Sequence, residues 1–104
     1  MSDVPVYMVA NLVVEDADEY RVYEKGFFPI LKRFGGEFLT FDDNSENLEG
    51  SHPLEGRIIL FKFPSEEAAR NWYADEEYQQ LSAHRRAGTS LRSLTLAHGL
   101  PPRD

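Results

Sequence analysis

The chain has 104 residues and no cysteine, which is the length of one small domain and excludes disulfide bonds, thiolate metal sites and cysteine nucleophiles. Eleven lysines and arginines against eighteen aspartates and glutamates give a formal net charge of −7, so the protein repels nucleic-acid phosphates. No apolar run approaches the roughly 20 residues that cross a bilayer, and the first residues lack the features of a signal peptide; we therefore expect a cytoplasmic protein without nucleic-acid or membrane partners.

The first predicted strand and helix span residues 6–34. Residues 6–14 are rich in valine and predict a strand that is apolar on both faces. Asp16 is a suitable N-cap for a helix in which apolar residues recur at spacings of three and four up to Phe34. Pro29 predicts a kink in this helix, and Gly35-Gly36 ends it.

The rest of the chain predicts three strands and two helices. The strands are expected at residues 37–42, 57–63 and 91–97. The polar residues 43–53 predict a loop between the first two of them. Ser65 and Asp75 are suitable N-caps for the two helices that precede the last strand.

The order is therefore strand, helix, strand, strand, helix pair, strand, in one domain over residues 1–104 with a core at about 6–99 and a tail at 100–104. This α+β order predicts a four-stranded antiparallel sheet with the helices on one face. The strands are apolar on both faces, but the helices cover only one. A second copy of the sheet would cover the other, so we expect a homodimer.

An ordered set of motifs resembles the family named domain of unknown function 1330. The motifs lie between residues 6 and 99: Tyr20-Arg21-Val22-Tyr23, Pro29, Gly35-Gly36-Glu37-Phe38-Leu39, Leu48-Glu49-Gly50, Phe63-Pro64-Ser65, Ala68-Ala69, Trp72-Tyr73 and Glu77-Tyr78. Each motif is weak alone, but the ordered set is specific. The resemblance implies a ferredoxin-like βαββαβ sandwich of the dimeric α/β-barrel superfamily, whose members pair their sheets face to face across a central cavity.

The resemblance does not select a function, because the family has no settled activity. Relatives by fold include cofactor-free monooxygenases, lactone isomerases, haem-handling enzymes and non-catalytic small-molecule binders. We expect no bound cofactor.

Asn11 is the fully polar residue of the first predicted strand. A buried amide without hydrogen-bond partners costs about 1–3 kcal/mol, so its partner is a ligand, a water molecule or a neighbouring strand residue. By analogy with cofactor-free oxygenases, such an amide would orient a substrate oxygen.

The aromatic side chains with polar tips are Tyr20, Tyr23, Trp72, Tyr73 and Tyr78, and the first four are further candidates for a pocket. Their helical spacing favours packing in the core. Some of them would instead line a pocket between the first helix and the sheet, because buried tyrosine and tryptophan tips need partners.

Arg85 and His84 complete the candidate residues. Arg85 lies seven residues after Tyr78, on the same side of the predicted helix, where it would bind an anionic ligand or pair with a carboxylate such as Glu49. Arg57 is expected to be a rim or interface charge. The histidines have no metal-ligand spacing, so we expect no metal site.

Three functions follow as alternatives. The first is a homodimer that binds a small, partly apolar molecule between helix and sheet, near Asn11 and the tyrosine and tryptophan side chains. The second is a cofactor-independent monooxygenase or isomerase for a small aromatic or polyketide-like substrate, in which Asn11 orients the substrate and His84 or a tyrosine moves a proton. The third is a structural or interaction module. A pocket of a few hundred Å³ with three converging polar groups would favour the first two.

Overall fold

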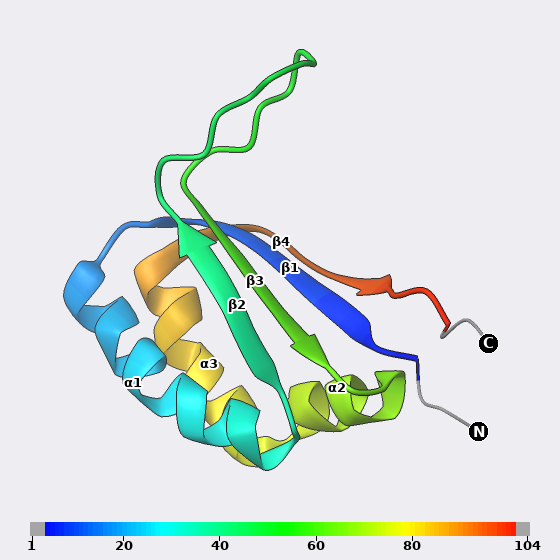
Figure 1. The fold of residues 1–104 in the computed structure, drawn as a ribbon. Coiled ribbons are helices and arrows are strands. Elements are labelled where there is room, and N and C mark those ends of the chain that lie inside the picture. Colours follow the sequence, from blue (N-terminus) through cyan, green and yellow to red (C-terminus); the bar gives the residue numbers. More distant parts are fainter. Residues whose placement is uncertain (1–3, 102–104) are drawn as a thin grey trace.

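The computed structural model describes residues 4–101. Within this range, the elements follow in the order β1 (Val6–Val14), α1 (Ala17–Arg33), β2 (Glu37–Asp42), β3 (Arg57–Phe63), α2 (Glu66–Ala74), α3 (Glu76–Gly88) and β4 (Thr89–His98) (Figure 1). The predicted bounds of β1, β2 and β3 are confirmed. β4 begins before the predicted residue 91, because Thr89 and Ser90 already pair with Val14 and Val13 of β1.

The three helices begin where the sequence predicts an N-cap. The side chains of Asp16, Ser65 and Asp75 accept the backbone N–H groups of Glu19, Ala68 and Tyr78 at 3.2, 3.1 and 2.9 Å. Each bond satisfies a donor that the first helical turn leaves unpaired. α1 continues through Pro29. Gly35 follows it with a φ of 75°, a left-handed conformation that glycine adopts at little cost.

The predicted antiparallel sheet is confirmed, with the strand order β2-β3-β1-β4. The helices lie on one of its faces (Figure 1). Along β1 the buried side chains that point toward the helices are Val6, Met8, Ala10 and Leu12. Tyr7, Val9 and Val13 alternate onto the opposite face, where they are half-buried or exposed.

The molecule is a thin slab of two layers. It measures 45 × 38 × 17 Å, and its Cα radius of gyration of 14.6 Å exceeds the roughly 13 Å of a compact domain of this length. The second face of the sheet has no covering layer within residues 4–101 (Figure 1). The prediction that the helices cover one face is therefore confirmed.

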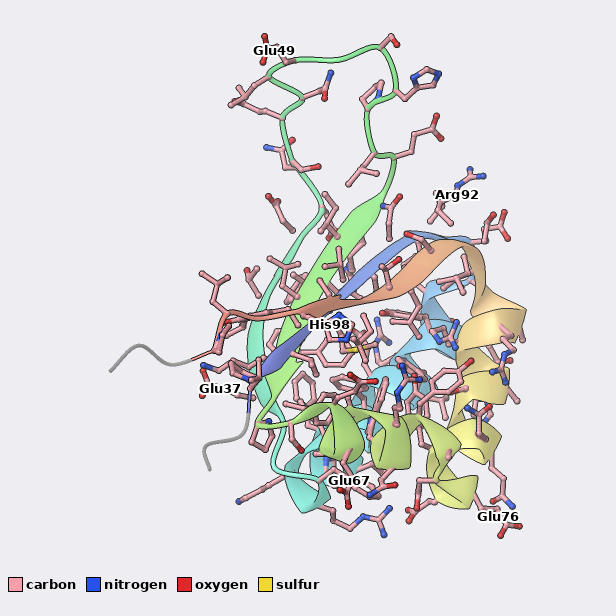
Figure 2. All side chains as sticks on the ribbon, turned by 90° about the vertical axis from the view of Figure 1, so that its right-hand side faces the viewer. Glu37, Glu49, Glu67, Glu76, Arg92 and His98 are labelled. Carbon is pink, nitrogen blue, oxygen red and sulfur yellow. The ribbon has the colours of Figure 1, made fainter. Side chains whose placement is uncertain are left out.

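The loop between β2 and β3 projects beyond the sheet (Figure 1). It runs over residues 43–56, somewhat longer than predicted, and all of its side chains are exposed. Glu49 lies at its outer end (Figure 2).

α1 and α3 pack closely at Gly26. A Cβ atom on Gly26 would lie 2.8 Å from Leu81 Cδ1 of α3, closer than carbon atoms approach in folded proteins. The residue that weakens α1 as a helix is therefore the one that lets α3 approach it. The backbone N–H groups of Glu15 and Asp16 also donate to the carbonyl of Gly88, at 2.8 and 3.0 Å. These contacts bring the inner side of α3 against α1.

No helix within residues 4–101 has the length and apolarity to cross a membrane. Residues 1–3, on which part of the signal-peptide prediction depended, and residues 102–104 of the predicted tail lie outside the described residues.

Candidate functional site

A pocket of about 140 Å³ lies between α1 and the helix-covered face of the sheet. α1 contributes Tyr20, Tyr23, Phe27 and Phe28, the strands contribute Phe38, Phe41 and Phe61, and α3 contributes Tyr78. Phe28 and Phe41 are 49% and 51% exposed, so they lie where the pocket meets solvent. The pocket is smaller than the few hundred Å³ expected. It is close to the engineered apolar cavity of about 150 Å³ that binds benzene, and its size corresponds to one aromatic ring.

Tyr20 and Tyr23, two of the tyrosines that line the pocket, are uncharged at neutral pH. The hydroxyl groups of Tyr23 and Tyr78 form a hydrogen bond with each other at 2.8 Å. Burial and then Tyr78 raise the pKa of Tyr23 well above its ordinary value. Burial and then the charge of Glu24 raise the pKa of Tyr20 to about 12. Neither tyrosine therefore carries a negative charge at neutral pH.

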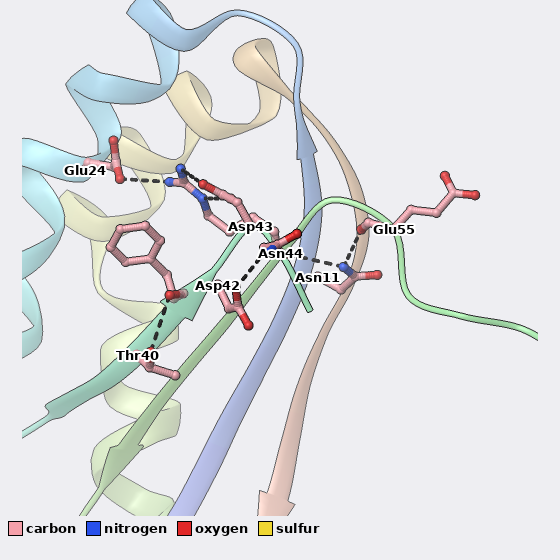
Figure 3. A network of polar contacts seen from close by, with 9 residues as sticks. Asn11, Glu24, Thr40, Asp42, Asp43, Asn44 and Glu55 are labelled. Atoms are coloured by element: carbon pink, nitrogen blue, oxygen red, sulfur yellow. Dashed lines mark hydrogen bonds and ion pairs between the residues drawn. The ribbon is translucent and has the colours of Figure 1, made fainter. Parts of the chain in front are cut away.

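Arg57 lines the pocket at the start of β3, and other residues of the chain pair with its charge. Nε and Nη2 donate to the two carboxylate oxygens of Asp43 at 2.7 and 2.9 Å, and Nη1 donates to Glu24 at 3.1 Å (Figure 3). The rings of Phe41 and Tyr20 lie 4.6 and 5.6 Å from the guanidinium carbon. The bond from Arg57 lowers the pKa of Asp43 below its ordinary value.

Arg85 also lines the pocket, from the last turns of α3, and among residues 4–101 its charge has no such partner. The residue is 4% exposed. Its Nε and Nη1 atoms are buried without a hydrogen-bond partner among the described residues. Its guanidinium carbon lies 5.7 Å from the centre of the Tyr23 ring. Of the alternatives for Arg85, the ion pair with Glu49 is wrong, because Glu49 lies at the outer end of the β2–β3 loop (Figure 2).

A groove of about 390 Å³ lies on the other side of Arg85, between β4 and the helices α2 and α3. Leu91 and Leu94 of β4 line both the groove and the pocket, as does Arg85. Arg70 and Arg86 also line the groove. Arg85 thus lies in a wall that the pocket and the groove share.

The structure brings three of the predicted residues together, since Tyr20, Tyr23 and Arg85 all line the pocket. Asn11 was predicted near this pocket, and that placement is wrong. Its neighbours Ala10 and Leu12 line the pocket, so Asn11 points to the opposite face of the sheet. There its Nδ2 donates to the carbonyls of Glu55 and Arg57 at 2.7 and 3.2 Å (Figure 3). Its partners are backbone groups, one of the alternatives left open by the sequence.

Trp72, Tyr73 and His84 do not line the pocket. Trp72 is 0% exposed in the core, with its ring 5.3 Å from those of Phe61 and Phe63. Tyr73 lines the groove. His84 lies outside both and contacts the carboxylate of Glu19 through Nδ1. It faces the start of α1 because it is one residue, or about 100° of helix, away from Arg85.

Glu24 is a charged residue of the pocket that the sequence analysis did not indicate. It lies four residues after Tyr20, which places both on the same side of α1. That spacing was the available signal, but it gives no indication of the long-range partner, Arg57.

No group of three His, Asp or Glu side chains within residues 4–101 is arranged to hold a metal ion. His52 and His98 contact Ser51 and Glu66 at 3.0 and 2.9 Å.

Two solved structures have the same fold at low identity. The protein of unknown function RPA0582 from Rhodopseudomonas palustris is 18% identical, with a TM-score of 0.76, and the alignment covers 96% of this chain and 85% of that one. The cofactor-independent oxygenase SnoaB from Streptomyces nogalater is 13% identical, with a TM-score of 0.56, and the alignment covers 100% and 96%. At these identities, both likenesses show the fold alone.

No curated protein matches the chain. Residues 5–100, nearly the whole sequence, match the domain of unknown function DUF1330. The chain therefore belongs to the DUF1330 family.

Proposed function

We propose that this protein is a homodimer that binds a small molecule, about the size of one aromatic ring, between α1 and the sheet. The observation that carries the proposal is the pocket of about 140 Å³ with aromatic walls. Protein interiors are otherwise close-packed, and an apolar pocket with a few polar groups is the usual form of a ligand site.

Filling the pocket tests this function. Ala10 is a small residue in the wall of the pocket, so Ala10→Leu places three further carbon atoms where the ligand would lie. Ala83, an exposed residue of α3, provides the matched control Ala83→Leu. Benzyl alcohol at millimolar concentration is the probe, detected by ligand-observed NMR. We expect binding to the wild type and to Ala83→Leu, and none to Ala10→Leu. Equal binding to all three proteins would contradict the proposal.

Cofactor-independent oxygenation or isomerisation is the second candidate, because the fold resembles that of SnoaB. Such chemistry needs a group that accepts a proton from the substrate. The two pocket tyrosines with raised pKa values are poor bases at neutral pH, and Glu24 is held by Arg57. Binding without chemistry is therefore the function that the pocket supports best. A purely structural module would not need an open pocket.

The proposal of a homodimer rests on the uncovered face of the sheet. Tyr7, Val9 and Val13 of β1 lie on this face beside Ile58 and Leu60 of β3. Apolar side chains of two central strands are thus left without a covering layer within residues 4–101. A second copy of the chain, related by a two-fold axis, would pack the same face against this one, and the apolar side chains of both copies would be buried.

A matched pair of variants tests the dimer. Val9→Asp places a charge at the centre of the uncovered face, and Val22→Asp places one on the exposed surface of α1. Light scattering at micromolar concentration is expected to give a dimer mass for the wild type and for Val22→Asp, and a monomer mass for Val9→Asp. A monomeric wild type, or a dimeric Val9→Asp variant, would contradict the proposal.

A further inference from the structure

We infer that the ligand is an aromatic monoanion, whose ring occupies the pocket and whose carboxylate binds Arg85. This inference rests on the proposed binding function and specifies its ligand. It starts from the burial of Arg85, which is 4% exposed and has two nitrogen atoms without a partner among the described residues. A buried charge is normally paired, because removing an ion from water is costly.

Among residues 4–101, the pocket offers Arg85 no free counter-charge. Glu24, the carboxylate in the pocket wall, already accepts a hydrogen bond from Arg57 at 3.1 Å. The hydroxyl groups of Tyr23 and Tyr78 bond to each other at 2.8 Å. Tyr20 and Tyr23 have raised pKa values and stay neutral. Because residues 4–101 leave Arg85 without a free carboxylate in the pocket, we assign its partner to a bound anion.

The residues that line the pocket indicate that the ligand has one aromatic ring and one negative charge. Aromatic side chains from α1, α3 and the sheet enclose a space the size of one ring. A ligand ring in this space would make edge-to-face or offset contacts with them, which are the arrangements that aromatic rings prefer. One unpaired guanidinium matches one negative charge. A second charge would remain unpaired and would face Glu24, so a dianion such as a phosphate monoester fits less well.

The groove behind Arg85 adds positive charge close to the proposed carboxylate site. Arg85 lies in the wall shared by groove and pocket, and Arg70 and Arg86 line the groove. Arg70 is paired with Glu66 at 2.6 Å, and Arg86 donates to the neutral side chain of Gln79 at 3.0 Å. The charge of Arg86 is therefore not neutralised by Gln79, and it favours an anion on Arg85, although the protein carries a formal net charge of −7.

Isothermal titration calorimetry with benzoate and benzyl alcohol tests the inference. Both probes carry one ring, and only benzoate is charged. We expect wild-type protein to bind benzoate about tenfold more tightly than benzyl alcohol, since hydrogen bonds to charged groups discriminate by about this factor or more. Arg85→Gln should lose about tenfold in benzoate affinity while its affinity for benzyl alcohol stays within about twofold. Arg85→Met provides a second variant with the same expectation.

The control variant is Arg21→Gln, an exposed arginine of α1 whose side chain is 61% exposed; its affinities should match those of the wild type. Benzyl alcohol binding as tightly as benzoate, or benzoate binding that survives Arg85→Gln and Arg85→Met, would overturn the carboxylate inference and leave the pocket function standing. If neither probe binds the wild type, the proposed function fails, and the inference fails with it.

Discussion

Two arginines line the same pocket, and they differ in how their charges are paired. Arg57 donates to Asp43 and Glu24 through all three of its nitrogen atoms. Arg85 is more deeply buried, and two of its nitrogen atoms have no partner among residues 4–101. We therefore expect Arg57 to stabilise the fold and Arg85 to lower its stability. A buried charge that the fold does not pair is an indication of a binding site.

Replacing Arg57 should have the largest effect on stability. Arg57→Met removes three hydrogen bonds to two carboxylates and the contacts with the rings of Phe41 and Tyr20. We expect the free energy of unfolding, measured by urea denaturation, to fall by about 2 kcal/mol. Arg21→Met, at an exposed position, should change it by less than about 0.5 kcal/mol. An Arg57→Met variant as stable as Arg21→Met would contradict the stabilising role of Arg57 and, with it, the contrast between Arg57 and Arg85.

Asn11 provides a second test of the comparison between Arg57 and Arg85, because its side-chain amide donates a hydrogen bond to the backbone carbonyl of Arg57. Asn11→Ala should destabilise the protein by about 1–2 kcal/mol, since it removes two hydrogen bonds at a buried position. Its benzoate affinity should stay within about twofold of the wild type, because the side chain lies on the other face of the sheet. A tenfold loss of benzoate affinity with the fold intact would show that Asn11 contributes to the binding site after all.

Variants of Tyr23 and Tyr78 test whether their hydroxyl groups form a hydrogen bond with each other and not with Arg85. Tyr23→Phe and Tyr78→Phe should each cost about 1 kcal/mol, because each leaves one buried hydroxyl unpaired. The double variant should cost less than the sum of the two single variants, since it leaves none. Additive costs, measured in a double-mutant cycle by denaturation, would contradict the pairing.

The smallest expected effect is the pH dependence of the Asp43–Arg57 pair. Arg57 lowers the pKa of Asp43 below 3.8 in the folded protein, so the stabilisation is present above this pH and is lost as the pH falls through the folded pKa. The pair is partly exposed, and its contribution is below about 1 kcal/mol. Asp43→Asn should be less stable than the wild type at pH 7, and the difference should shrink below pH 3.8. A difference that stays constant with pH would contradict this contribution.

The elements could be predicted from the sequence because their signals are local. Caps at Asp16, Ser65 and Asp75, and the valine-rich first strand, each depend on a few adjacent residues. The alternation of residues 6–14 also separates Asn11 from Ala10 and Leu12. It does not show which of the two faces meets the helices, because both are apolar, and this is why Asn11 was assigned to the wrong face.

The pairing of the arginines could not be predicted, because it depends on tertiary contacts. Arg57 meets Glu24 across 33 positions of sequence. Arg85 was correctly placed among the tyrosines by its spacing of seven from Tyr78, but the sequence supplied several carboxylates as partners for it. Only the folded arrangement shows that Glu49 lies out on the loop and that Glu24 is occupied by Arg57.

The unfolding free energy of ligand-free Arg85→Met, compared with the wild type, tests the central claim most directly. Methionine replaces the arginine with an apolar side chain and removes the buried charge. If Arg85 has no partner in the free protein, the variant should be at least as stable as the wild type, and benzoate should stabilise the wild type more than the variant. Destabilisation by about 2 kcal/mol, as expected for Arg57→Met, would mean that the fold does pair Arg85, and would contradict the account.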